Sequence, residues 1–328
     1  MPFFPVEPVV RQPRLALISL LACLPWCMPA SAITFQTRME RVEWKVEGDQ
    51  FECRLTQPVA DFGSGEFVRR AGEQATFRLK MRERWLGPGS ATLLAAAAPW
   101  QAGRGDINLG ALAVGSGAVP FNSNQEQAGR LLAGLMEGRS PLVRHRTLQG
   151  GDSIEVRLLP IRFNQAYSDY LKCTAGLLPV NFDQIRQTQI GFSGGGTALD
   201  PLGQAKLDII LDFLKADPSV NRIQLDGHSD NSGSRLTNRD TSRRRALAVE
   251  EYLKANGVAA EQILVRFHGE RYPLAPNNSE SNRAKNRRVT MTLSREAVPE
   301  TPAETAPATP PAAEPAAPAP PAKAASLS

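Results

Sequence analysis

A carboxylate and a guanidinium stand fifteen positions apart in the stretch GHSDNSGSRLTNRDTSRRRALAV, residues 227–249. Asp230 follows a predicted strand that ends at His228, and Arg245 belongs to a predicted helix, four residues before Val249. Residues four apart share a helix face, so the Arg245 side chain is expected to lean toward the sheet. The two charges could form a structural ion pair. They could also bind a zwitterion, with Asp230 taking its ammonium and Arg245 its carboxylate.

Three consecutive arginines, Arg243–Arg245, are expected in the opening turns of that helix. The N-terminal end of a helix carries partial positive charge, which disfavours an exposed cation there by roughly 0.3–1 kcal/mol. A nearby acidic side chain or an acidic ligand is therefore expected to compensate these charges. Arg243 and Arg244 point elsewhere than Arg245 and are expected to be solvated.

Residues 183–294 supply the elements that must position these charges. Strands and helices alternate there in the order βαβαβ with one further strand, which predicts helices packed on one face of a small mixed sheet. Asp200 is the expected N-cap of the first helix, Pro201 its first residue, and Gly257 the stop of the second. The predicted strands are TQIGF, NRIQLDGH, QILVRFHG and RVTMTL.

Residues 33–182 favour a β-rich domain with a few helices, so the chain as a whole is assigned to the α+β class. Apolar and charged residues alternate in RVEWKVEG, FECRL and ATFRLKM, and residues 147–158 have the form of a hairpin. One helix is predicted in EQAGRLLAGLMEG and a second from Asn164. His145 stands alone as a surface or strand histidine, and no catalytic constellation is recognised in this half.

Residues 1–32 have the pattern of a cleavable signal peptide, with a short apolar run and the sequence ASA before Ile33. A lipoprotein cleavage site at Cys23 is the rival interpretation. No later stretch is long and apolar enough to predict a transmembrane helix. Export leaves Cys53 and Cys173, which most simply form one disulfide in an oxidising compartment, and two buried thiols are the alternative.

Several other chemistries are set aside. The net charge of +5 is too weak a bias to indicate nucleic acid. The sequence GFSGG fits a nucleophile elbow, but the domain is too small for the sheet which that motif needs. His228, Asp230 and His268 would have to converge to bind a metal, and neither metal nor cofactor is expected. Residues 295–328, rich in Pro and Ala, are expected to be a disordered tail.

The stretch GHSDNSGSRLTNRDTSRRRALAVEEYLKANGV, followed by HGERYPLAPN and NRRV, resembles the OmpA-like peptidoglycan-binding domain. The resemblance implies that Asp230 and Arg245 bind the diaminopimelate of the peptidoglycan stem peptide. It also implies supporting roles for four matching residues: Asn238, Ser242, Arg287 and Ser229, the last standing where threonine is usual. Ser193 departs from the family, which often has an acidic or amide residue there, and the glycine loop that follows is longer.

The N-terminal segments VEWKVEGDQFECRL, AGRLLAGLMEG and LLPIRFNQAYSDYLKCTAGLLPVNFDQI resemble the MotY family of periplasmic flagellar motor proteins. The resemblance implies a non-enzymatic protein whose residues 33–182 bind the flagellar basal body and whose residues 183–294 bind the cell wall. It implies a periplasmic location at the basal body on the outer-membrane side, ring and stator proteins as partners, and self-association in a ring. The family's disulfide falls at Cys53 and Cys173. The alternative is a general OmpA-family wall tether unconnected with motility.

Overall fold

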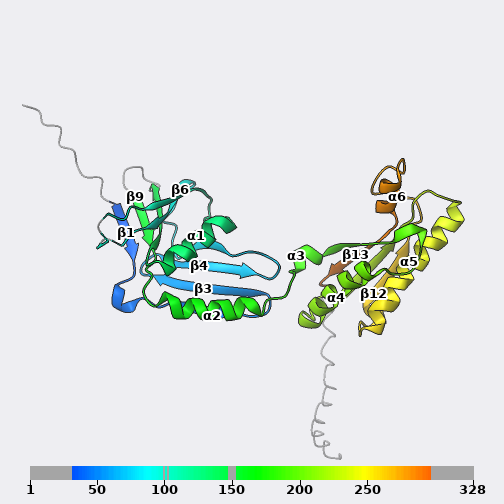
Figure 1. Ribbon diagram of the computed structural model, residues 1–328, viewed down its shortest axis with the longest axis horizontal. Helices are drawn as coiled ribbons and strands as arrows, with labels where there is room; N and C mark the ends of the chain where they lie inside the picture. The colour runs from blue at the N-terminus through cyan, green and yellow to red at the C-terminus, as the bar shows by residue number, and fades with distance from the viewer. Residues whose placement is uncertain (1–31, 99, 102, 147–152, 297–328) are drawn as a thin grey trace, which may run out of the picture. The chain divides into compact units, whose positions relative to one another are not determined.

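A computed structural model describes residues 32–98, 100–101, 103–146 and 153–296 of the chain. The chain divides into two compact units, which meet in sequence between Leu177 and Leu178 and are described separately below (Figure 1). The predicted signal peptide up to residue 31, the predicted turn at residues 147–152 and the tail from residue 297 lie outside the described residues. None of the helices in the described part is long and apolar enough to span a membrane.

The N-terminal unit contains two sheets. One has five strands in the order β1-β9-β8-β6-β7, and the other has four in the order β2-β3-β4-β5. The five strands are β1 (Ala32–Gln36), β9 (Ser153–Arg157), β8 (Ser140–Arg146), β6 (Gly89–Ala96) and β7 (Ile107–Val114). The four are β2 (Lys45–Gly48), β3 (Glu52–Val59), β4 (Gly63–Arg70) and β5 (Thr76–Met81).

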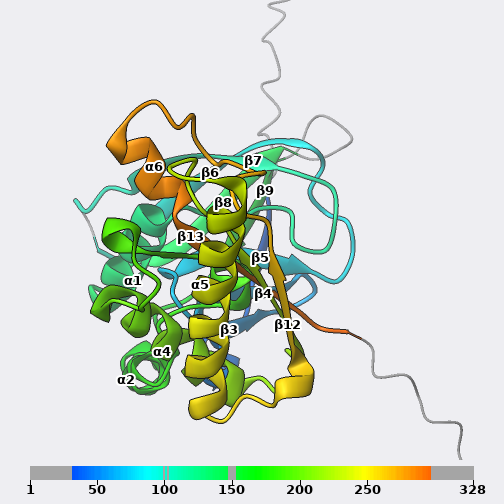
Figure 2. The ribbon, with the colours of Figure 1, turned by 90° about the vertical axis from the view of Figure 1, so that its right-hand side faces the viewer.

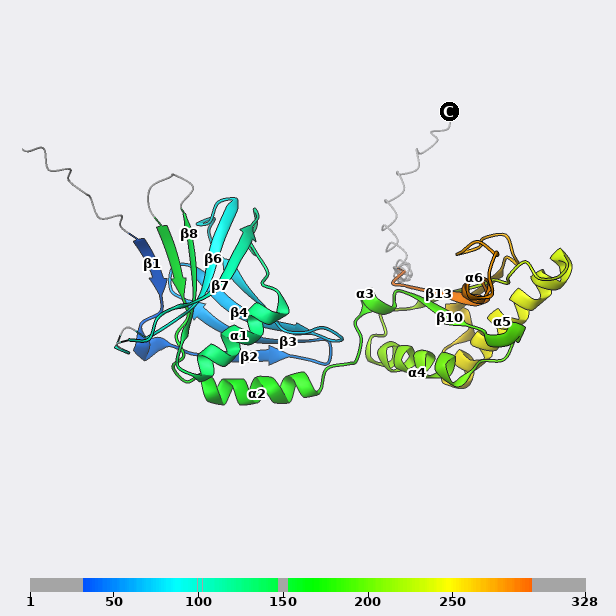
Figure 3. The ribbon, with the colours of Figure 1, turned by 45° about the horizontal axis from the view of Figure 1, so that its top comes forward.

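Two helices pack on these sheets, α1 (Gln125–Met136) and α2 (Phe163–Ala175), as the apolar spacing predicts. Helix α1 is closed at its N-terminus by a capping box in which Asn124 and Gln127 bond reciprocally. Helix α2 lies along β2 and β3 (Figure 3) and is joined to β3 by the Cys53–Cys173 disulfide. The pairing expected from the cysteine count is thereby confirmed.

The C-terminal unit has a four-stranded sheet in the order β10-β13-β11-β12. Strands β11 and β12 are parallel, whereas β13 is antiparallel to both β10 and β11. The strands are β10 (Gln187–Gly191), β11 (Arg222–Gly227), β12 (Ile263–Phe267) and β13 (Arg288–Ser294). The helices are α3 (Phe182–Ile185), α4 (Pro201–Ala216), α5 (Arg235–Ala255) and α6 (Glu280–Asn286). The mixed α+β class is confirmed.

Helix α4 packs on β10, while α5 crosses β11, β12 and β13, and Figure 2 shows α5 beside β12. Asp200 caps α4 through its side chain, which accepts a hydrogen bond from the Gly203 N–H, and Pro201 is the first helical residue, as predicted. The described residues also form three short 3-10 turns: Met39–Arg41, Ser193–Gly195 and Ala260–Gln262.

Helix α5 begins earlier than the sequence suggests, which corrects one expectation. Ser234 is the N-cap, its hydroxyl accepting a hydrogen bond from the Thr237 N–H, so the helix starts at Arg235. Arg243–Arg245 therefore lie beyond the first two turns instead of in the opening turns. The helix dipole acts mainly within the first turn, so it does not require an acidic group opposite these three arginines.

The strand register defines two ends of the C-terminal sheet. At one end Arg222 pairs with Ser294, and at the other Gly227 pairs with Val289. Just past the first end, the Arg295 guanidinium carbon lies 4.1 Å from the Phe182 ring centroid. The candidate binding residues follow the second end. The segment that leads in from the N-terminal unit and the segment that leads out after β13 both join the sheet at the first end.

Candidate functional site

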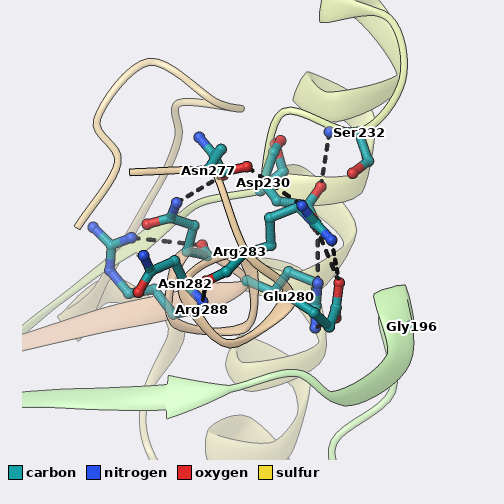
Figure 4. A network of polar contacts seen from close by, with 12 residues as sticks. Gly196, Asp230, Ser232, Asn277, Glu280, Asn282, Arg283 and Arg288 are labelled. Carbon is teal, nitrogen blue, oxygen red and sulfur yellow. Dashed lines mark hydrogen bonds and ion pairs between the residues drawn. The ribbon is translucent and has the colours of Figure 1, made fainter. Parts of the chain in front are cut away.

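Asp230 lies in the loop between β11 and α5 and is buried. Its Oδ2 accepts a hydrogen bond from Arg287 Nη1 at 2.9 Å, and its Oδ1 accepts one from the Ser232 N–H at 3.1 Å (Figure 4). Burial acts to raise the pKa of this carboxyl. The hydrogen bonds and the positive charges of Arg287 and Arg245 outweigh burial and hold the pKa below its usual range.

Arg287, at the junction of α6 and β13, bridges two carboxylates. Its Nη2 donates to Glu280 Oε1 at 2.6 Å while its Nη1 holds Asp230. Glu280 is exposed at the start of α6 and also accepts hydrogen bonds from Arg283 (Figure 4). The possible structural ion pair between Asp230 and Arg245 is therefore not formed, because the Asp230 carboxylate pairs with Arg287 instead.

Arg245 is almost completely buried, with 1% of its surface exposed, as its spacing from Val249 predicts. Its Nε donates to the Gly196 carbonyl at 2.9 Å and its Nη1 to the His228 carbonyl at 3.1 Å. The guanidinium carbon also lies 5.5 Å from the Phe192 ring centroid. Nη2 forms no hydrogen bond with any described residue, and no described carboxylate lies within ion-pair distance.

The charge state of Arg245 follows from this environment. Burial lowers its pKa to about 10, against the opposing effect of Asp230. The guanidinium is therefore still a cation near neutral pH. A buried cation that bonds to neutral carbonyl oxygens retains unused capacity for an anion, because charged pairs are the stronger hydrogen bonds.

The predicted supporting residues fix the loops around this pair. Ser242 is fully buried, and its hydroxyl donates to the Arg239 carbonyl and accepts from the Gly269 N–H at 3.0 Å. The Ser229 N–H donates to the Gly269 carbonyl at 2.9 Å. The Asn238 side-chain amide donates to the Glu270 carboxylate. These residues tie the loop after β12 to α5 and to the loop after β11.

Gly227 allows α5 to approach the sheet at this point. A Cβ built on it would lie 2.1 Å from the Ser242 carbonyl oxygen, which no real side chain tolerates. The absence of a side chain therefore determines how closely Ser242 and Arg245 lie to the end of β11.

Sequence reasoning missed Asn286, which is fully buried. Its Oδ1 accepts from the N–H groups of Leu274 and Ala275, and its amide donates to the Ala275 carbonyl and to Asn277. It anchors the loop that precedes α6, and thereby the position of Arg287. The only sequence signal was its place in the NRRV motif.

The two histidines of the metal site that was considered and set aside above have other contacts. The His228 and His268 rings stack with centroids 5.2 Å apart, and His268 Nε2 lies 2.7 Å from Asp226 Oδ1. Asp226 also accepts a hydrogen bond from Arg266 at 2.9 Å. Among the residues that the structure describes, no three His, Cys, Asp or Glu side chains are grouped to hold a metal ion.

Comparison with known families accounts for both units. Residues 35–179 match the MotY N-terminal domain, and residues 191–287 match the OmpA family. The chain therefore has the domain combination of MotY. Its similarity to the sodium-type flagellar protein MotY of Vibrio parahaemolyticus is 27% identity over 263 residues, which covers 79% of this chain and 89% of that protein.

Two further relatives match the C-terminal unit alone. The peptidoglycan-binding protein ArfA of Mycobacterium tuberculosis is 38% identical over 105 residues, or 32% of each chain. The peptidoglycan-associated lipoprotein of Pseudomonas putida is 36% identical over 104 residues, which covers 32% of this chain and 61% of the relative. The OmpA part is therefore shared with proteins of other architectures, whereas the combination of both parts is shared with MotY.

Proposed function

We propose that this protein is a non-enzymatic periplasmic component of the flagellar motor that anchors stator units to the cell wall. The observation that carries the proposal is the buried Arg245 guanidinium, which has no carboxylate partner among the described residues, on the same rim as Asp230. The MotY and OmpA family matches support it, as do relatives named for their association with peptidoglycan.

The ligand we infer is the zwitterionic end of diaminopimelate in a stem peptide. Arg245 would donate its free Nη2 to the ligand carboxylate, and Asp230 would accept from the ligand ammonium. Arg287 positions the Asp230 carboxylate, so the ammonium must share that carboxylate with it or displace it. Asn238, Ser229 and Ser242 support the clamp through their bonds to the loop after β12.

The N-terminal unit is assigned the motor side. We propose that residues 33–182 bind basal-body ring proteins on the outer-membrane side and that copies of the chain associate in a ring. A cleavable signal peptide would direct export of the chain to the periplasm, where the Cys53–Cys173 disulfide is stable. Stators must be held against torque, and a protein fixed to the ring at one end and to the wall at the other would provide the support.

The test is sedimentation of the mature protein with purified Gram-negative sacculi. The Asp230→Ala and Arg245→Ala variants are compared with Arg243→Ala, which removes an exposed arginine from the same helix. We expect co-sedimentation to be lost in the first two variants, to persist in the third, and to weaken with salt because the clamp is electrostatic. Unchanged binding in folded Asp230→Ala and Arg245→Ala proteins would overturn the wall contact.

A general wall tether is the second candidate, because proteins such as the Pseudomonas putida lipoprotein share the C-terminal unit alone. It would keep the clamp and lack a motor partner. Localisation of a fluorescent fusion at flagellated sites, and impaired swimming on deletion, favour the motor role. Uniform distribution around the envelope with normal swimming would favour the tether.

A further inference from the structure

An open pocket of about 450 Å³ lies between the first turns of α5 and the loop that follows β12. None of its lining residues bonds to the side chains of Asp230 or Arg245, although Gly269 and Glu270 bond to residues that support the candidate wall site. Three arginines, two apolar side chains, a histidine, a glycine and a glutamate line it: Arg235, Leu236, Arg239, Phe267, His268, Gly269, Glu270 and Arg271.

The pocket carries an excess of positive charge. Arg235, Arg239 and Arg271 are exposed, and none of them forms an ion pair within the described part of the chain. The one acidic group of the lining, Glu270, accepts from the Asn238 amide. Three cations around a single cavity favour an anionic occupant, and they repel one another in its absence.

This pocket is on a different side of α5 from the candidate wall site. With about 100° between successive residues, Arg235 and Arg239 project on one flank of the helix and Asn238 and Arg245 on another. Arg245 reaches toward Gly196, in the loop between β10 and α4. The pocket opens instead beside β12. Strands β12 and β10 are the two edge strands of this sheet among the described residues.

Apolar surface in the pocket narrows the class of ligand. Leu236 is 80% exposed, and the guanidinium carbon of Arg239 lies 5.3 Å from the Phe267 ring centroid. A free inorganic anion would use the arginines and leave this surface in water. A peptide that combines carboxylates with apolar side chains would use both. The adjacent β12 has a strand neighbour on one side only among the described strands, an edge to which an extended peptide can add.

We propose that this pocket binds an acidic, partly apolar peptide segment of a protein partner, independently of the wall site. Its carboxylates pair with Arg235, Arg239 and Arg271, and an apolar side chain packs on Leu236 and Phe267. The C-terminal unit would then hold the wall on one flank of α5 and a protein on the other.

The probe is a short fluorescein-labelled peptide of alternating glutamate and leucine, with glutamine replacing glutamate in the matched control peptide. Fluorescence anisotropy with the full mature chain is expected to show saturable binding of the acidic peptide and none of the control. Arg239→Gln and Arg271→Gln should each weaken binding about tenfold, which corresponds to about 1.4 kcal/mol for each lost charge pair. Arg130→Gln removes one exposed, unpaired charge from α1 in the other unit and should change nothing.

Absence of saturable binding would overturn the proposal. Equal weakening by Arg130→Gln would also overturn it, because it would show that only the net charge of the protein attracts the peptide. So would an Arg239→Gln protein that loses sacculus binding and keeps peptide binding, which would place the pocket in the wall site. Sedimentation of Asp230→Ala with sacculi reports on the wall site separately, so either proposal can fail alone. Circular dichroism confirms that each variant is folded.

Discussion

Arg287 and Arg245 both act on the Asp230 carboxylate, but only Arg287 bonds to it. Arg287 Nη1 lies 2.9 Å from Asp230 Oδ2, whereas the two bonded nitrogens of Arg245 end on the carbonyls of Gly196 and His228. The rim thus carries one satisfied ion pair and one cation without a counterion. This division of roles means that the two arginines should respond differently to substitution.

Replacing Arg287 with alanine should mainly destabilise the C-terminal unit. The change leaves the buried Asp230 carboxylate without its cation, which typically costs about 3 kcal/mol in the free energy of unfolding. It should also raise the pKa of Asp230, because the hydrogen bond and the charge that lower it are gone. Urea denaturation measures the first effect. Arg244→Ala, which breaks an exposed pair with Asp240, is the control and should cost less than about 0.5 kcal/mol. Equal losses in both variants would contradict the assignment.

His228 should make the C-terminal unit less stable in mild acid. Burial and the charges of Arg288 and His268 lower the pKa of His228 to about 4, although the charge of Asp226 acts to raise it. The unfolded chain takes up its proton near pH 6.5 and the folded chain near pH 4, so stability is complete above pH 6.5 and falls between these values. The expected loss is about 3 kcal/mol. NMR titration of the folded protein measures the pKa directly, and protonation of His228 near pH 6.5 would contradict the prediction.

Gly227→Ala should disrupt the packing of α5 on the sheet. The added methyl group meets the Ser242 carbonyl oxygen, so the helix must move, at a typical cost of about 1–3 kcal/mol. Gly191→Ala, in β10 of the same sheet, meets nothing within 4 Å and should be nearly neutral. Thermal denaturation of the two variants gives the comparison. Similar midpoints would show that the approach of α5 is not set by Gly227.

Removal of the disulfide should destabilise the N-terminal unit alone. The bond closes a loop with a sequence separation of 120 residues, and loss of such a bond typically costs about 2–5 kcal/mol. We expect the double variant Cys53→Ser/Cys173→Ser to lower the unfolding midpoint of that unit. Tryptophan fluorescence measures this midpoint, because Trp44 and Trp85 lie in the N-terminal unit. Sacculus binding by the C-terminal unit should persist. Its loss would show that the two units do not act independently.

Local patterns were sufficient for much of the C-terminal unit. The spacing of Arg245 and Val249 placed the arginine on the buried side of α5, and Asp200 with Pro201 marked the start of α4. Each of these features depends on residues within one turn or one cap. They could be predicted because the periodicity and the capping chemistry are local.

The remaining features depend on contacts between distant segments. Asp230 and Arg287 are separated by 57 residues, and only the antiparallel pairing of β11 and β13 brings them together. The start of α5 was misplaced because Ser234 competes as a cap with later polar residues, and local sequence does not decide between them. The role of Asn286 depends on its hydrogen bonds to a loop eleven or twelve residues earlier in the chain, and these bonds form only in the folded structure.

The two ends of the C-terminal sheet also determine how the unit would bear mechanical load. A pull from the N-terminal unit would enter near Gln187, at the start of β10, while the wall ligand proposed for Asp230 and Arg245 would resist at the other end of the strands. Such a force runs along β10, β11 and β13. The ladder hydrogen bonds between these strands would then be strained in shear, many at once, instead of being opened one after another. The resistance of such a link to rupture would then depend on the direction of its strands relative to the force, as well as on its thermodynamic stability.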